Sequence, residues 1–240
     1  MNAALLPTLL LLTASTPSLP KVTFDAHLLG VTAAVRNVEA QKREDVPDFF
    51  PPRHVRVTLG QPGDNARELN VYPVAGLLAQ YPGLREGVRT EIGSLKALLA
   101  ERPAPKAIRG ELPFLPLPFA GQVLNAAVKY LDFPGGRGVR YLVAYSQDAS
   151  PLSRERVFYT FQGLTNDGKH YVSLQYPVSL KELPTDPFAG PNRAVMDALN
   201  SGDTTIWKVY VARTKGQLDA LTGDARLTKI DAFVKSLRLR

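Results

Sequence analysis

Three side chains in the second half of the chain could form a Ser-His-Asp relay. Ser146 and Asp148 stand two residues apart at the end of a predicted strand, so they would share one face of it. His170 would have to bridge them as the base, and an oxyanion hole would also be needed. No motif in the sequence specifies either requirement. An envelope hydrolase that uses these three residues is therefore the weaker of two functional hypotheses.

The other residue types point away from catalysis and metal binding. The histidines His27, His54 and His170 are far apart, and none belongs to a His-x-x-x-His pair. The chain contains no cysteine, which excludes disulfides, zinc bound by cysteine and thiol catalysis. Residues 166–168 (Asn-Asp-Gly) lack the dense carboxylates that calcium requires, and a hairpin turn explains them. We therefore expect neither a metal nor a cofactor.

Aromatic and basic side chains suggest a binding surface instead. The predicted binding residues are Tyr145, Gln147, Tyr159, Phe161, Arg137 and Arg140. Tyr159 and Phe161 share one face of a predicted strand, which could bind a partner if no helix covers it. The alternative is that helices cover both faces of this strand. The net charge of +7 favours an anionic envelope polymer or a protein partner, whereas the basic residues are too dispersed for nucleic acid.

The first twenty residues differ from the rest of the chain. They carry no charged side chain, and an apolar run that ends at residues 9–12 precedes the small residues 13–16. This order is typical of a secretory signal peptide, although no Lys or Arg precedes the run. No later segment has the roughly 20 apolar residues that a membrane span needs. We expect a leader at residues 1–20 and one exported domain at residues 21–240, in the periplasm, the cell envelope or outside the cell.

Residue periodicity predicts both strands and helices. Val55, Val57 and Leu59 alternate in the strand predicted for residues 54–59. Residues 84–102 repeat apolar side chains every three or four positions, which is typical of an amphipathic helix. Further strands are predicted at residues 22–25, 33–40 and 68–72, and further helices at 74–81, 190–199, 204–221 and 227–237. Asp224 is a candidate N-terminal cap for the last helix. Residues 237–240 could form a short edge strand.

Residues 122–180 form the centre of the predicted fold. Strands are expected at residues 122–131, 139–147, 156–164 and 169–177. The Asn-Asp-Gly turn between the last two strands favours a hairpin, since these residues accept positive φ angles. The fold class is therefore α+β, with an antiparallel β-meander packed against helices as an α/β sandwich. We expect the proline-rich residues 112–118 to seal the core, and the loop 41–52 to lie on the body through Phe49 and Phe50.

Several segments resemble an uncharacterised family of bacterial exported proteins and lipoproteins. They are FYTFQGLT at residues 158–165, DGK at 167–169, YVS at 171–173, VYPV at 71–74, LPFLP at 112–116 and DAFVKSL at 231–237. The family has no assigned chemistry, so the resemblance implies no catalytic residue. Its lipoprotein members carry a cysteine after the leader, which this chain lacks. The meander and long C-terminal helix also resemble the α/β sandwich of the photosystem PsbP proteins, a fold analogy that implies no function.

These observations favour an exported module that binds a ligand or a protein partner without catalysis. The hydrolase is the alternative, and a purely structural accessory protein is a third possibility. A pocket that brings His170 or His54 within reach of Ser146 or an acidic side chain would favour the hydrolase. An apolar meander face with a basic rim would favour binding.

Overall fold

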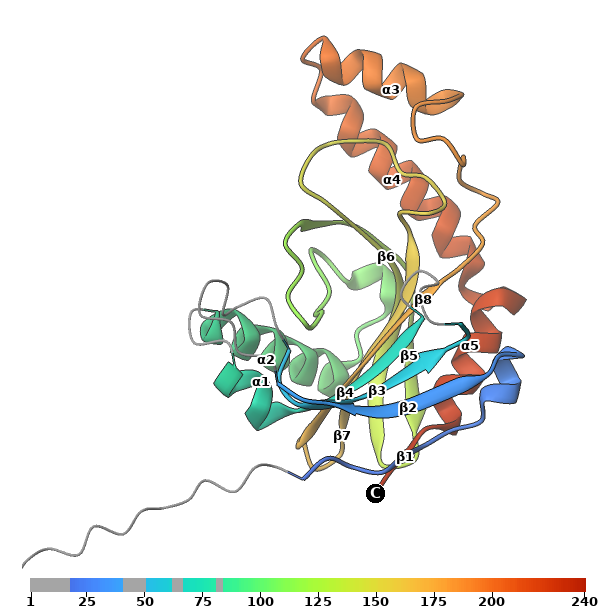
Figure 1. Cartoon of the computed structure of the whole chain (residues 1–240). Coiled ribbons are helices and arrows are strands. Elements are labelled where there is room, and N and C mark those ends of the chain that lie inside the picture. Colours follow the sequence, from blue (N-terminus) through green and yellow to red (C-terminus); the bar gives the residue numbers. More distant parts are fainter. Residues whose placement is uncertain (1–17, 41–50, 62–66, 81–83) are drawn as a thin grey trace, which may run out of the picture.

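A computed structural model describes residues 18–40, 51–61, 67–80 and 84–240. Most of the predicted leader and both Phe49 and Phe50 lie outside these residues. Seven strands form one antiparallel sheet in the order β2-β3-β4-β8-β7-β6-β5 (Figure 1). The strands are β2 (Ala33–Val38), β3 (His54–Leu59), β4 (Glu68–Pro73), β5 (Gly121–Phe133), β6 (Gly136–Ser146), β7 (Phe158–Thr165) and β8 (His170–Pro177). The α+β class and the meander from β5 to β8 are confirmed.

The N-terminal hairpins and the meander join in the middle of this sheet. Val71 of β4 pairs with Val172 of β8, although 101 positions separate them. The β7–β8 hairpin turns at Gly168, which has a φ of 69°. In the same turn, Asp167 Oδ1 accepts hydrogen bonds from Thr165 Oγ1 (2.6 Å) and from the Lys169 amide (3.0 Å). The predicted Asn-Asp-Gly turn is therefore confirmed, with the aspartate as its local anchor.

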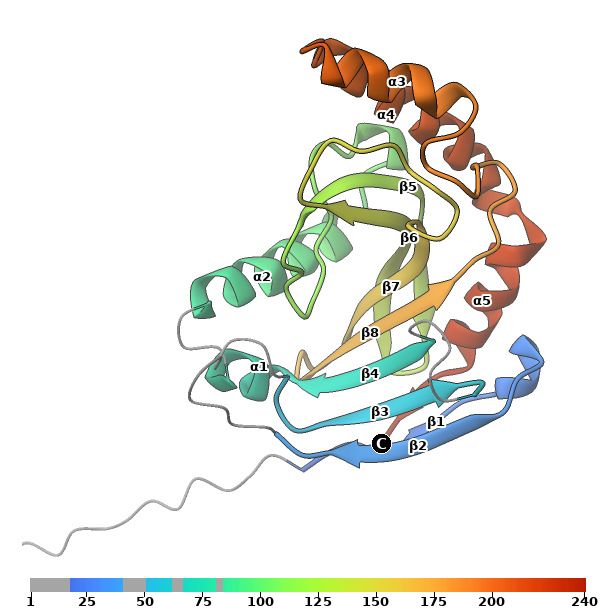
Figure 2. The ribbon, with the colours of Figure 1, turned by 45° about the horizontal axis from the view of Figure 1, so that its top comes forward.

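Helices cover both faces of the sheet (Figure 2). The helices are α1 (Val74–Gln80), α2 (Arg85–Glu101), α3 (Pro191–Asn200), α4 (Thr205–Asp219) and α5 (Ala225–Ser236), with 3-10 turns η1 (Ala26–Leu29), η3 (Pro105–Ala107) and η4 (Ala220–Gly223). A separate pair of short strands, β1 (Val22–Thr23) and β9 (Arg238–Leu239), joins the two ends of the described chain. None of the described helices combines the length and the apolar character of a membrane span.

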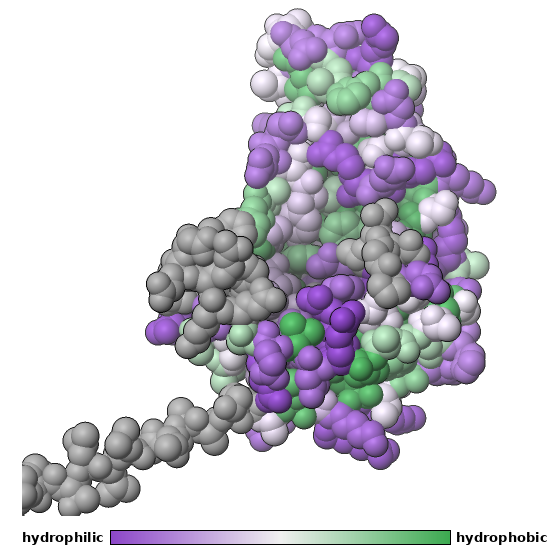
Figure 3. All heavy atoms as spheres, viewed as in Figure 1, coloured by the Kyte–Doolittle hydropathy of each residue, from purple (hydrophilic) through white to green (hydrophobic). Residues whose placement is uncertain are grey.

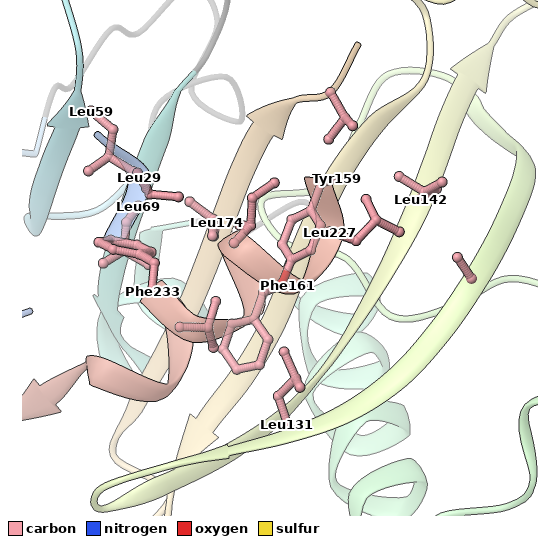
Figure 4. Packing of buried hydrophobic residues seen from close by; sticks show 14 of the residues in the cluster. Leu29, Leu59, Leu69, Leu131, Leu142, Tyr159, Phe161, Leu174, Leu227 and Phe233 are labelled. Carbon is pink, nitrogen blue, oxygen red and sulfur yellow. The ribbon is translucent and has the colours of Figure 1, made fainter. Parts of the chain in front are cut away.

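The first core lies between the sheet and α5 (Figure 4). α5 begins at Asp224, whose side chain accepts a hydrogen bond from the Arg226 amide at 2.8 Å, so the predicted cap is confirmed. Its buried apolar residues are Leu227, Ile230, Phe233 and Val234. Tyr159 and Phe161 point from β7 into this core and are completely buried. Gly138 leaves room for the Phe161 ring, since a Cβ there would lie 2.3 Å from Phe161 Cζ.

The second core lies between the opposite face of the sheet and α1, α2 and the proline-rich segment. α2 buries one stripe at helical spacing, formed by Val88, Ile92, Leu95 and Leu99. The proline-rich segment buries Leu112, Phe114 and Leu115 in the same cluster. Its backbone groups bond to the sheet: Tyr141 OH donates to Pro113 O (2.7 Å), and the Leu115 amide donates to Gln162 Oε1 (3.3 Å). The predicted sealing role of this segment is confirmed.

Candidate functional site

The predicted relay of Ser146, Asp148 and His170 does not assemble. The register pairs Gly136, at the start of β6, with Thr165 at the end of β7. His170 starts β8 at that same end of the sheet, whereas Ser146 ends β6 at the opposite end. Ten residues of strand at ~3.3 Å each separate the two ends by about 30 Å. The expectation that Ser146 and Asp148 share a strand face was wrong, because β6 ends at Ser146 and Asp148 lies in the loop beyond it. Strand periodicity also carried no information about where His170 lies.

Ser146 and Asp148 instead close the loop that follows β6. Asp148 Oδ1 accepts hydrogen bonds from Ser146 Oγ (2.8 Å) and Ser150 Oγ (2.6 Å). Arg156 donates to the same two hydroxyls, at 2.7 Å and 2.6 Å. The hydrogen bonds from Ser150 and then Ser146 lower the pKa of Asp148. This arrangement holds the loop together, and no histidine takes part in these contacts.

His170 lies in a pocket of about 460 Å³ at the other end of the sheet. The pocket is lined by Ser18, Pro73, Val74, Ala75, Leu78, Gly168, Lys169 and His170. Burial lowers the pKa of His170, which favours its neutral form. None of the described carboxylates lines this pocket, and the described residues contain no cluster of three or more potential metal ligands. The Asp167 carboxylate of the adjacent turn raises the pKa of His170, but less than burial lowers it.

Arg140 lies in the first core and not on a binding surface. Its Nε lies 3.1 Å from Asp231 Oδ1, and Tyr159 OH donates to the same oxygen at 3.1 Å. Lys129 Nζ binds the second carboxylate oxygen of Asp231 at 3.0 Å. Arg140 is completely buried, so it cannot contact an external polymer in this structure. The signal that sequence reasoning missed is Asp231 itself, a carboxylate next to Ile230 in a helix that packs on the core.

The remaining predicted binding residues are also separated. Tyr145 packs its ring 5.1 Å from that of Phe114, and its hydroxyl accepts a hydrogen bond from Gln122 Nε2 at 3.0 Å. Gln147 Nε2 donates to Phe119 O at 3.0 Å. Both residues therefore hold the proline-rich side of the molecule. Arg137 is exposed at the far end of β6, beside the turn that starts this strand. With Tyr159, Phe161 and Arg140 buried, the six residues form no common surface.

A groove on the α3–α4 hairpin was not predicted. The hairpin extends beyond the end of the sheet, and α3 packs on α4 rather than on the strands (Figure 1). The groove measures about 200 Å³ and has mostly apolar walls. It is lined by Glu182, Leu183, Pro184, Pro191, Asn192, Val195, Ile206, Val209, Tyr210, Arg213, Thr214 and Gln217. Val209, which lines this groove, remains 64% exposed.

Two polar contacts fix the hairpin on the loop that Ser146 and Asp148 organise. Tyr210 OH accepts a hydrogen bond from the Leu152 amide at 2.8 Å. Asn192 Nδ2 donates to Leu152 O at 3.2 Å. The Trp207 ring stacks on Tyr210 with centroids 5.6 Å apart. The groove is therefore held in shape by hydrogen bonds from both helices.

The sequence carried one signal for this groove. Helical spacing in the sequence places Trp207, Val211, Leu218 and Leu221 on one stripe of α4. Ile206 and Val209 fall outside that stripe, and this leaves two apolar side chains that the core does not explain. Figure 3 shows green, apolar atoms among the purple ones at the tip of the molecule, where α3 and α4 lie.

No protein-family model, no curated protein and no solved structure matches the chain. The resemblance to bacterial exported proteins and the PsbP-like analogy therefore stay predictions. The function must be argued from the residues described above.

Proposed function

We propose that the chain is an exported, non-catalytic module that binds a protein partner through the α3–α4 groove. The observation that carries this proposal is an apolar groove, held in shape by Tyr210 and Asn192, on a hairpin that extends beyond the sheet. Leaving apolar side chains in water costs about 25 cal/mol per Å² of exposed area. Burial of Val209 by a partner would recover this free energy.

The residue types in and beside the groove suit protein recognition. Trp, Tyr and Arg are enriched among the residues that dominate binding energies, and Trp207, Tyr210 and Arg213 follow one another along α4. A surface that is already ordered loses less conformational entropy on binding. Tyr210 and Asn192 supply that order here.

The groove also suggests what the partner presents to it. Glu182 at the rim already binds Arg226 at 2.8 Å, and this ion pair lowers the pKa of Glu182. Arg213 makes no ion pair with any described residue. A partner segment with an apolar anchor beside a carboxylate would fill the groove and pair with Arg213. An anionic polymer is less well suited, because Arg137 and Arg140 do not converge on one surface.

Export rests on the uncharged, leucine-rich residues 1–20. It is tested by N-terminal sequencing of the protein recovered from the cells that make it. A mature chain that starts near residue 16 supports export. A protein that stays in the cytoplasm with Met1 retained contradicts it.

The binding proposal is tested by photocrosslinking in those cells. A photoreactive phenylalanine derivative replaces Val209 in one variant and Lys208 in a matched control. These neighbours lie on different sides of α4, and only Val209 lines the groove. We expect one covalent adduct of defined mass from position 209 and little from position 208. Equal yields at both positions, or no adduct at either, would contradict the proposal.

A further inference from the structure

The two edges of the seven-stranded sheet are protected to different degrees. At the β5 edge, the register shifts twice, between Gln122 and Leu124 and between Ala126 and Lys129. Bulges of this kind disrupt pairing with another chain. α4 also covers this edge: the Ala127 amide donates to Asp219 Oδ1 (2.7 Å), and Lys215 Nζ donates to Asn125 O (2.7 Å). Two backbone groups that an added strand could use, the Ala127 amide and the Asn125 carbonyl, are therefore occupied.

The β2 edge has none of these protections. All six residues of β2 pair with β3 in a continuous register, without a bulge and without a proline. Five of the six are exposed, and Val35 has an exposed fraction of 51%. Among the described residues, no strand or helix pairs with the outer side of β2. A regular, exposed edge of this kind is a template for another strand.

The hydrogen-bond pattern identifies which backbone groups face outwards. The Gly60 amide donates to Thr32 O at 2.8 Å, so this pair exchanges a hydrogen bond across β2 and β3. Bonded and non-bonded pairs alternate along an antiparallel ladder. The amides and carbonyls of Ala33, Val35 and Asn37 therefore point away from β3. The Leu59 amide, opposite Ala33, accordingly donates to Arg67 O of the β4 side at 2.9 Å.

We propose that β2 binds an extended, acidic peptide segment of a partner protein by β-strand addition. Main-chain hydrogen bonds to Ala33, Val35 and Asn37 would supply affinity. Arg36 would select the sequence, because it makes no ion pair with any described residue and lies directly opposite Arg56. Arg56 is already paired with Glu68 at 3.4 Å, so Arg36 is the cation of this strand pair, among the described residues, that could bind a carboxylate of the peptide.

The charge at this edge argues against a second copy of the chain. Two β2 strands paired around a two-fold axis would add a second Arg36 to an edge where Arg36 already lies opposite Arg56. Like charges on neighbouring strands are destabilising. The net charge of +7 on each chain adds a further repulsion. This surface is separate from the α3–α4 groove and does not depend on the function proposed for it.

The test uses the ¹⁵N-labelled full chain and the synthetic peptide acetyl-Thr-Val-Glu-Val-Thr-Val-amide. A matched peptide carries lysine in place of glutamate. NMR titration gives the affinity of each peptide, and amide hydrogen exchange reports on Ala33, Val35 and Asn37. We expect saturable binding of the glutamate peptide, a two- to fivefold preference for it over the lysine peptide, and protection of these three amides in the complex.

Three variants separate strand addition from other binding. Val35→Pro removes an outward amide that β3 does not use, and should weaken binding at least ~5-fold. Val35→Thr keeps the amide and should bind within about twofold of the natural chain. Arg36→Glu should reverse the preference between the two peptides. Equal binding by Val35→Pro and Val35→Thr, an unchanged preference in Arg36→Glu, or amides at 33, 35 and 37 that are already protected without peptide would each overturn the proposal.

Discussion

Arg140 and Asp231 form an ion pair inside the first core, with Nε and Oδ1 3.1 Å apart, although 91 positions separate them in the sequence. The pair connects β6 to α5. Arg140 also donates to the Ala127 carbonyl, in the bulged part of β5, and to Thr222 O at 2.5 Å. Ala127 has a φ of 52°, an uncommon conformation for a residue other than glycine. The ion pair therefore joins the sheet, its bulge and the C-terminal helices at one point.

Replacing only one residue of this ion pair should strongly destabilise the folded chain. Arg140→Met leaves the Asp231 carboxylate buried without its guanidinium, and the free energy of unfolding should fall by about 3–5 kcal/mol. The double variant Arg140→Met with Asp231→Leu removes both charges and should recover part of this loss. Urea denaturation of the natural chain, both single variants and the double variant checks this. A strictly additive double variant would show that the two residues do not interact energetically.

The turn at Asp167 gives a second prediction. Hydrogen bonds from Thr165 and Lys169 lower the pKa of Asp167. The ionised form is therefore favoured in the folded chain, so its contribution to stability is present above the unfolded pKa and lost as the pH falls through the lowered value. Asp167→Ala should lower the thermal midpoint at pH 7 and have a smaller effect in acid. A variant that kept its thermal midpoint but lost a ligand would contradict the turn interpretation.

Protonation of buried His54 should destabilise the folded chain at a higher pH than protonation of Asp167 does. Its Nδ1 lies 2.7 Å from Pro52 O and its ring 4.7 Å from that of Tyr72, and burial lowers its pKa below 6.5. The unfolded chain then binds a proton at a higher pH than the folded chain. The free energy of unfolding should therefore be highest above pH 6.5 and fall as the pH drops through the lowered pKa. His54→Phe keeps a ring beside Tyr72 and should flatten this part of the profile.

Urea denaturation at intervals from pH 8 to pH 5 provides the comparison for His54. The variant His27→Phe is a matched control, because His27 is exposed. If His54→Phe retained the full pH dependence, another group would be its source.

Sequence patterns predicted the local elements well for identifiable reasons. The strand at residues 54–59 was predicted with its observed bounds because Val55, Val57 and Leu59 alternate. Asp224 was recognisable as a cap because a cap acts within one turn. The predicted contact between Ser146 and His170 was wrong, because strand periodicity gives the face of a side chain but not the end of the sheet where it lies. The pairing of Arg140 with Asp231 depends on the same long-range topology.

The hydrogen bond from the Leu152 amide to Tyr210 OH should keep the α3–α4 hairpin ordered. Tyr210→Phe removes the acceptor for the Leu152 amide and should cost about 1 kcal/mol of stability. The larger effect should be local: amide exchange in α3 and α4 should accelerate, and the crosslinking yield at position 209 should fall. Lys208→Ala alters the same helix but makes no change at the Leu152 contact. It should therefore change neither the amide exchange nor the crosslinking yield. Unchanged exchange in Tyr210→Phe would mean that packing alone orders the hairpin.

Trp207 reports directly on whether the α3–α4 groove binds a partner. It is the only tryptophan in the chain, and its ring stacks on Tyr210 in the groove wall. The chain labelled with 5-fluorotryptophan therefore gives a single ¹⁹F resonance, which is followed while the crosslinked partner, purified in its free form, is added. We expect a saturable shift of this resonance, with an affinity that Val209→Glu lowers at least ~10-fold and Lys208→Glu changes less than about twofold. A partner that binds with no shift of the resonance, or that binds the two variants equally well, would contradict this expectation.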